Sequence, residues 1–323
     1  MKYFLYPTFL LILISCSGDL NNNLSKIEIE ESVYLGPDTS KIPEGPEGEM
    51  IRYGKDLIVN TAYYIGPDGV NGQYLGNKMN CTNCHLDAGT RPYGFNFFST
   101  YANYPQYRSR ENSVLTIEQR INNCVERPHN GVPLPLDSKE MIAITAYIQF
   151  LGRGVPIGET MLGSQGIDLQ FPDRAADPEN GKAIFLAECA SCHLTNGEGV
   201  FTPDEVTYVY PPIWGPYSYQ PGSSMFRIIK AARFIKANMP NDKATWQNPY
   251  LTDEQALDVA AYINSPEHFR PNNGGLDYKD SSTKYVDYPF GPYDDPFSQN
   301  QHKYGPFQEI IEYRKNHDLY LNY

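Results

Sequence analysis

The sequence has few basic residues, few cysteines and no basic tail. Its 323 residues include 26 Lys and Arg against 38 Asp and Glu, a formal net charge of −12. We therefore expect no nucleic-acid partner. A basic protein, or a small ligand held in a local cationic pocket, is still compatible with this charge. Six cysteines are too few for a disulfide scaffold at this length. At 41% hydrophobic residues the chain is not a disordered acidic protein. Its 323 residues, at about 150 residues per domain, predict two domains.

The N-terminal apolar run, residues 4–14, is too short to cross a bilayer and is typical of a signal peptide. It ends in Leu13-Ile14-Ser15-Cys16, which resembles a bacterial lipobox. This resemblance implies a signal peptide over 1–15, a lipid on Cys16 and a tether over 16–45. A soluble secreted protein is the alternative. In both cases we expect export. For the lipoprotein, we expect the anchor to be the only membrane contact and the body to face the periplasm.

Two copies of the pattern Cys-x-x-Cys-His carry the strongest chemical signal. Two thiols three residues apart can reach the two vinyl groups of one haem, and the following His can ligate its iron. One copy would leave a zinc or redox motif open, whereas two copies in an exported chain predict two covalently bound haem c groups. The attachment residues are Cys81, Cys84, Cys189 and Cys192, and the iron ligands are His85 and His193.

The surroundings of the two haem motifs repeat. Asp177 caps a helix that opens with Pro178 before the second motif, and residues 53–58 take the same place before the first. After each motif a late helix carries Ala-Tyr-Ile, around Tyr147 and Tyr262. We therefore expect a mainly α fold of two tandem class I cytochrome c domains with extensive loops. Their ranges are 46–155 and 177–272, with a linker over 156–176 and a Tyr-rich C-terminal extension over 273–323.

A sixth iron ligand is expected at each haem. In the second domain Met239 lies on the loop ahead of a helix that Thr252 and Gln255 open with a capping box. Met225 is the competitor, although its apolar neighbours favour a place on the core face of a helix. We expect Met239 to ligate the second haem.

The first domain has no Met between His85 and Met141, and Met141 falls inside the last helix, where a core position is expected. The segment instead contains Cys124, on a helix that a capping box at Thr116 opens. Arg120 precedes Cys124 by four residues and shares its helix face. A buried free thiol is the alternative. We expect Cys124 to ligate the iron, because a thiolate beside a cation is stabilised and lowers the haem potential.

These features together resemble the dihaem thiosulfate dehydrogenases, also called tetrathionate synthases or reductases. The resemblance covers about residues 48–272 and is most specific at 104–110, 115–124 and Asn130-Gly131. It implies His/Cys ligation of a catalytic first haem, His/Met (or His/Lys) ligation of an electron-transfer second haem, and Arg110 and Arg120 as active-site cations.

The implied reaction joins two thiosulfates into tetrathionate and releases two electrons, in either direction. In the mechanism proposed for the family, the cysteine sulfur bonds the sulfane sulfur of one thiosulfate, and a second thiosulfate attacks that adduct. Arginine forks suit sulfonate oxygens, so Arg110 and Arg120 are expected to bind substrate, and Arg127 either lines the same pocket or is solvated. The electrons are expected to reach an external acceptor, soluble or membrane-bound, such as a cytochrome c.

The sequence differs from the family pattern at two positions, and two other functions are alternatives to this interpretation. Pro128 occupies a position that is Ser in some relatives, and the next residue, His129, is either a donor or a surface side chain. Asn238 stands where some relatives have Lys, so we expect no Lys-to-Met ligand switch there. The other functions are a lipid-anchored electron-transfer cytochrome without a substrate and a sulfur-transfer cytochrome of the sulfur-oxidation type.

Overall fold

The computed structural model describes residues 32–271 and 278–323. Cys16 and the signal peptide lie outside these residues. No helix in the described part is long and apolar enough to cross a membrane. The first haem domain contains α1 (Pro46–Val59), α2 (Thr61–Ile65), α3 (Leu86–Gly89), α4 (Thr100–Asn103), β1 (Gln106–Arg108), β2 (Ser113–Leu115), α5 (Ile117–Glu126) and α6 (Lys139–Leu151). The second contains α7 (Pro178–Glu188), α8 (Ala190–His193), β3 (Val200–Phe201), β4 (Tyr208–Tyr210), α9 (Ile228–Asn238) and α10 (Asp253–Ile263), and the extension adds α11 (Gln299–Tyr304) and α12 (Phe307–Asn316).

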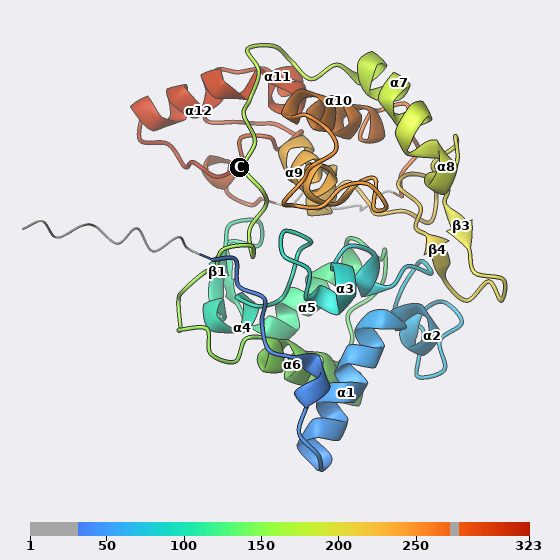
Figure 1. Cartoon of the computed structure of the whole chain (residues 1–323). Helices are drawn as coiled ribbons and strands as arrows, with labels where there is room; N and C mark the ends of the chain where they lie inside the picture. Colours follow the sequence, from blue (N-terminus) through green and yellow to red (C-terminus); the bar gives the residue numbers. More distant parts are fainter. Residues whose placement is uncertain (1–31, 272–277) are drawn as a thin grey trace, which may run out of the picture. The chain divides into compact units, whose positions relative to one another are not determined.

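The expected helix pairs are present in both haem domains. Helix α1 packs on α6, and α7 packs on α10 (Figure 1). Both crossings need a glycine. A Cβ on Gly54 would lie 1.9 Å from the Ala143 carbonyl oxygen, and one on Gly181 would lie 1.9 Å from the Asp258 carbonyl oxygen. The close approach of two helix backbones therefore explains the repeated glycine, and the repeat predicted from sequence is the repeat of the fold.

Local capping signals set the helix starts. The Asp177 side chain accepts from the backbone N–H groups of Glu179 and Asn180, and the Thr116 and Thr252 capping boxes both form. These caps satisfy N–H groups that have no partner inside the helix. The caps predicted from sequence are confirmed.

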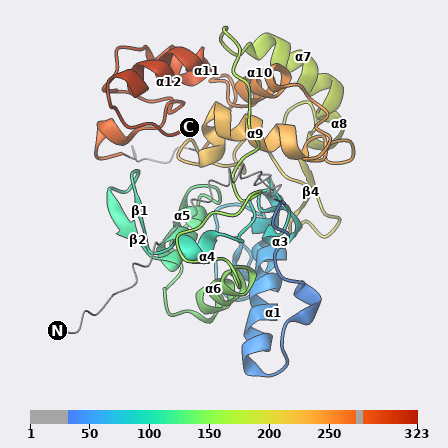
Figure 2. The same cartoon turned by 60° about the vertical axis from the view of Figure 1, so that its left-hand side comes forward.

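In the part of the chain that the structure describes, the strands form two short antiparallel ribbons. Strands β1 and β2 pair with Tyr107 opposite Val114, and this hairpin is seen most clearly in Figure 2. Strands β3 and β4 form the second ribbon. The β1–β2 hairpin leads directly into α5, so it positions the helix that carries Arg120 and Cys124.

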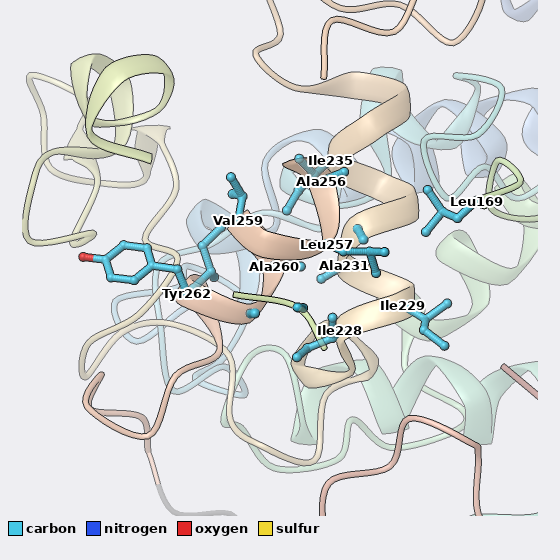
Figure 3. Close-up of a cluster of buried hydrophobic side chains, with 14 of the residues drawn as sticks. Leu169, Ile228, Ile229, Ala231, Ile235, Ala256, Leu257, Val259, Ala260 and Tyr262 are labelled. Carbon is cyan, nitrogen blue, oxygen red and sulfur yellow. The ribbon is translucent and has the colours of Figure 1, made fainter. Parts of the chain in front are cut away.

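The second core consists mainly of small and branched side chains from α9 and α10. Figure 3 shows Ile235 of α9 beside Ala256 of α10, and Ala231 of α9 beside Leu257 of α10. The extension supplies Val286, Phe307 and Ile310 to the same core, each at most 2% exposed. Residues 278–323 are therefore built into the second domain.

The described part of the tether contacts the first domain. The Tyr34 ring packs edge-on against Phe98 with centroids 5.3 Å apart, and the Tyr34 N–H donates to the Leu162 carbonyl. Ile42 is buried. Residues 33–45 therefore cover the domain rather than stand free of it.

Candidate active site

Both haem-motif histidines are oriented for iron. The Nδ1 atom of His85 is 2.5 Å from the Phe95 carbonyl oxygen, and the Nδ1 atom of His193 is 2.9 Å from the Pro211 carbonyl oxygen. A hydrogen bond at Nδ1 fixes the tautomer and leaves Nε2 for a metal. The His85 ring also stacks on Phe97 at 4.4 Å. The residues at both motifs therefore fit a c-type haem.

A cavity of about 440 Å³ lies on the Cys84, His85 and Cys124 side of the first domain. Residues from α5, α9 and the extension line it together, including Cys124, Lys230 and Tyr285. The cavity is thus formed by the first haem domain, the second haem domain and the extension. Its wall holds one carboxylate, Glu111, and seven basic side chains, Arg108, Arg110, Arg120, Arg127, Arg227, Lys230 and Arg233.

That excess of cations is notable in a chain with a net charge of −12. Basic groups gathered in a concave site raise the local concentration of small anions. The acidic composition did not exclude a local cationic pocket, and the structure contains one.

Cys124 and Arg120 form the centre of the site. The Arg120 guanidinium donates to the Cys124 Sγ at 3.0 Å, because the two residues are one helical turn apart on α5. Burial opposes ionisation of the Cys124 thiol, but the charge of Arg120 and a hydrogen bond with His85 outweigh it and lower the pKa to about 6. Burial raises the pKa of Cys81 to about 11 and that of Cys84 to about 12. Among these three thiols, Cys124 is the one held as a thiolate near neutral pH.

The other two predicted arginines line the same cavity. Arg110 donates to the Gly222 carbonyl oxygen of the second domain and lies over the Tyr278 ring at 5.7 Å. Arg127 forms an ion pair with Glu111 at 2.8 Å and is only 16% exposed. The alternative of a solvated Arg127 is therefore wrong.

His129 is neither a surface side chain nor part of the cavity wall. It is 5% exposed, with its Nε2 4.0 Å from the Cys81 Sγ and its Nδ1 3.2 Å from the Asn77 side-chain oxygen. Burial lowers its pKa to about 4, so the ring is neutral. Pro128, in contrast, does line the cavity, where it presents no hydroxyl.

The three methionines considered from sequence have different positions. Met141 is fully buried in a core with Leu134 and Val125, as expected. Met239 follows α9 and packs, with Cys189, against the second core. Met225 lies in the 3₁₀ turn Ser224–Phe226 rather than on the face of an α-helix. It lines the cavity that contains Cys124.

Sequence reasoning missed the contribution of α9 and the extension. Arg227, Lys230 and Arg233 are three residues apart and share one side of α9, and Tyr285, Asn322 and Tyr323 come from the extension. The regular spacing of the three cations is a signal that sequence alone offers. Their approach to Cys124 depends on how the two haem domains pack.

Comparisons with known proteins agree with this architecture. Residues 73–157 match the family model "SoxA/TsdA, cytochrome c domain", and residues 178–266 match the model "Cytochrome c". The thiosulfate dehydrogenase of Thiomonas intermedia is 34% identical over 75% of each chain, and that of Stutzerimonas stutzeri is 35% identical over 76% of each. The solved thiosulfate dehydrogenase TsdBA of Marichromatium purpuratum is 36% identical with a TM-score of 0.66, covering 72% of this chain. The match spans about half of that solved chain, 49%.

Two haem motifs, each inside a crossed pair of helices, define a dihaem c-type cytochrome with two covalently bound haem c groups. The first domain differs from a simple electron carrier by the cysteine and the cationic cavity beside its haem motif. The chain belongs to the thiosulfate dehydrogenase family.

Proposed function

We propose that this protein oxidises two thiosulfates to tetrathionate at Cys124, with the reverse reaction open to the same site. The contact between Arg120 and Cys124 inside a wall of seven cations carries the proposal. Thiosulfate dehydrogenases that are 34% and 35% identical to it over about three quarters of its length support it. Thiosulfate is a dianion, so bringing two together needs cations that face one small volume.

Both haems have residues that can hold them. Cys81 and Cys84 would attach the first haem, and His85 and Cys124 would hold its iron. Cys189 and Cys192 would attach the second, with His193 and Met239 as its ligands. When bound, the haems supply the redox chemistry, taking up the two electrons and passing them to an external cytochrome-type acceptor.

The chain's own residues bind and orient the sulfur compounds. Arg110 and Arg120 hold sulfonate oxygens of one thiosulfate, whose sulfane sulfur then bonds the Cys124 sulfur with loss of two electrons. The sulfane sulfur of a second thiosulfate then attacks the sulfane sulfur of the first, and Cys124 leaves as a thiolate. The sum is two thiosulfates giving one tetrathionate and two electrons, with no proton transferred. Arg120 stabilises the leaving thiolate.

The cellular placement follows from the N-terminus and is part of the proposal. Residues 1–15 act as a signal peptide, Cys16 carries the lipid, and the described body faces the periplasm. The length of chain before residue 33 then sets how far the body stands from the membrane.

A two-direction assay tests the function. Holoprotein with thiosulfate and ferricyanide should form tetrathionate, and reduced holoprotein should be reoxidised by added tetrathionate. Arg120→Met should lower kcat/KM for thiosulfate by about 10- to 100-fold, because a charge-assisted hydrogen bond is worth about 1.5–3 kcal/mol. Arg52→Met is the matched control, because Arg52 lies on α1 and does not line the cavity. Absence of turnover in both directions would leave the electron-transfer or sulfur-transfer alternative.

A further inference from the structure

Helix α9 of the second haem domain brings three cations to a cavity that otherwise belongs to the first. Arg227, Lys230 and Arg233 recur every third residue and all line the cavity, while the opposite side of α9 packs into the second core. The face that α9 turns to the cavity is therefore basic, in a chain with 26 basic residues in all. Nothing in the packing of α9 on α10 needs these charges.

Arg227 is already neutralised within the protein. Its guanidinium forms an ion pair with Asp287 of the extension at 2.8 Å and lies over the Tyr285 ring at 3.7 Å. Asp287 also accepts from the Ile229 N–H at 3.0 Å. Arg227 thus ties the extension to the start of α9 and serves the architecture of the cavity.

Among the described residues, neither Lys230 nor Arg233 forms an ion pair with an Asp or Glu side chain. The Lys230 ammonium lies 4.6 Å from the centre of the Phe95 ring. Arg233 donates to the Tyr323 backbone oxygen at 3.0 Å, and its buried Nε has no partner. Two cations therefore meet the cavity with hydrogen-bonding capacity left over.

The electrostatic cost of this arrangement is visible at Lys230. Burial lowers its pKa to about 7, and the charges of Arg227, Arg233 and Arg120 add to the effect, with Asp287 opposing it. A bound dianion would relieve that repulsion. The arrangement favours an anion over an empty or apolar occupant.

We propose that Lys230 and Arg233 form a second anion subsite, which binds the thiosulfate that attacks the Cys124 adduct. This rests on the proposed function, which places the first thiosulfate at Cys124 with Arg110 and Arg120. The two subsites use different structural elements, α5 with the segment after β1 for the first and α9 for the second. The packing of the two haem domains thereby sets the separation of the two thiosulfates.

The experiment separates loading of Cys124 from its discharge in the holoprotein. Limiting thiosulfate with ferricyanide loads Cys124, which is read as a mass increase on the peptide that contains it. Added thiosulfate then discharges the adduct to tetrathionate. Lys230→Met should load normally but need about 10- to 100-fold more thiosulfate for half-maximal discharge, as expected for a lost charge-assisted contact. Lys230→Arg should restore discharge to within a few-fold of wild type.

Lys182→Gln is the matched control, since Lys182 is exposed on α7 and its loss removes the same charge outside the cavity. Discharge of Lys230→Met at the wild-type thiosulfate concentration would overturn the subsite. So would a loss of loading equal to the loss of discharge, or an altered optical spectrum of the first haem with unchanged discharge, because Lys230 would then serve the first subsite or the haem. Failure of the wild-type protein to form tetrathionate would instead refute the proposed function.

Discussion

The ion pair between Arg227 and Asp287 should be a major contribution to stability. The two side chains are 7% and 0% exposed. Asp287→Asn keeps the size of the side chain and an acceptor for the Ile229 N–H, but it leaves the Arg227 charge buried without a counter-charge. Removing one partner of a buried pair costs about 3–5 kcal/mol. We expect that loss in the free energy of unfolding.

The size of this loss can be measured against an exposed pair. Arg153 and Glu47 are 49% and 69% exposed, so Glu47→Gln should cost about 0–1 kcal/mol. Urea unfolding of the holoproteins, followed by circular dichroism, gives both values. The double variant Arg227→Met, Asp287→Leu should lose less than the sum of its single variants, because no charge is left buried. Equal costs for Asp287→Asn and Glu47→Gln would refute the assignment of the extension as a structural part of the cavity.

Three further predictions follow from the geometry. Gly181→Ala should lower the free energy of unfolding by about 1–3 kcal/mol in the same urea titration, because its Cβ would overlap the Asp258 carbonyl oxygen; unchanged stability would contradict the close crossing of α7 and α10. The kcat/KM for thiosulfate should fall as pH rises through about 7, where Lys230 loses its proton, and this inflection should be absent in Lys230→Met. Met239→Ala should remove the sulfur-to-iron charge-transfer band of the oxidised second haem, whereas Met225→Ala should retain it.

The fold is largely readable from sequence because its signals are local. A haem motif, an N-cap and a capping box each occupy a few consecutive residues, and their side chains act on the backbone beside them. The repeat of Gly54 and Gly181 ahead of Tyr147 and Tyr262 then predicts the same helix crossing in both domains. These elements depend little on distant parts of the chain.

The candidate site is only half readable, for the same physical reason. Arg120 and Cys124 share one helix face, so their contact follows from their spacing. Lys230 lies more than a hundred residues further along and reaches the cavity through the packing of two domains. The exposure of His129 likewise depends on tertiary contacts, and sequence alone left it open.

Cys124→Gly in the holoprotein tests the central claim most directly. The variant should keep both haems, verified by mass and by the haem stain of the denatured chain, because the four attachment cysteines are unchanged. Its rate of tetrathionate formation from thiosulfate and ferricyanide should fall to background. Wild-type turnover by a Cys124→Gly protein that carries both haems would contradict the account.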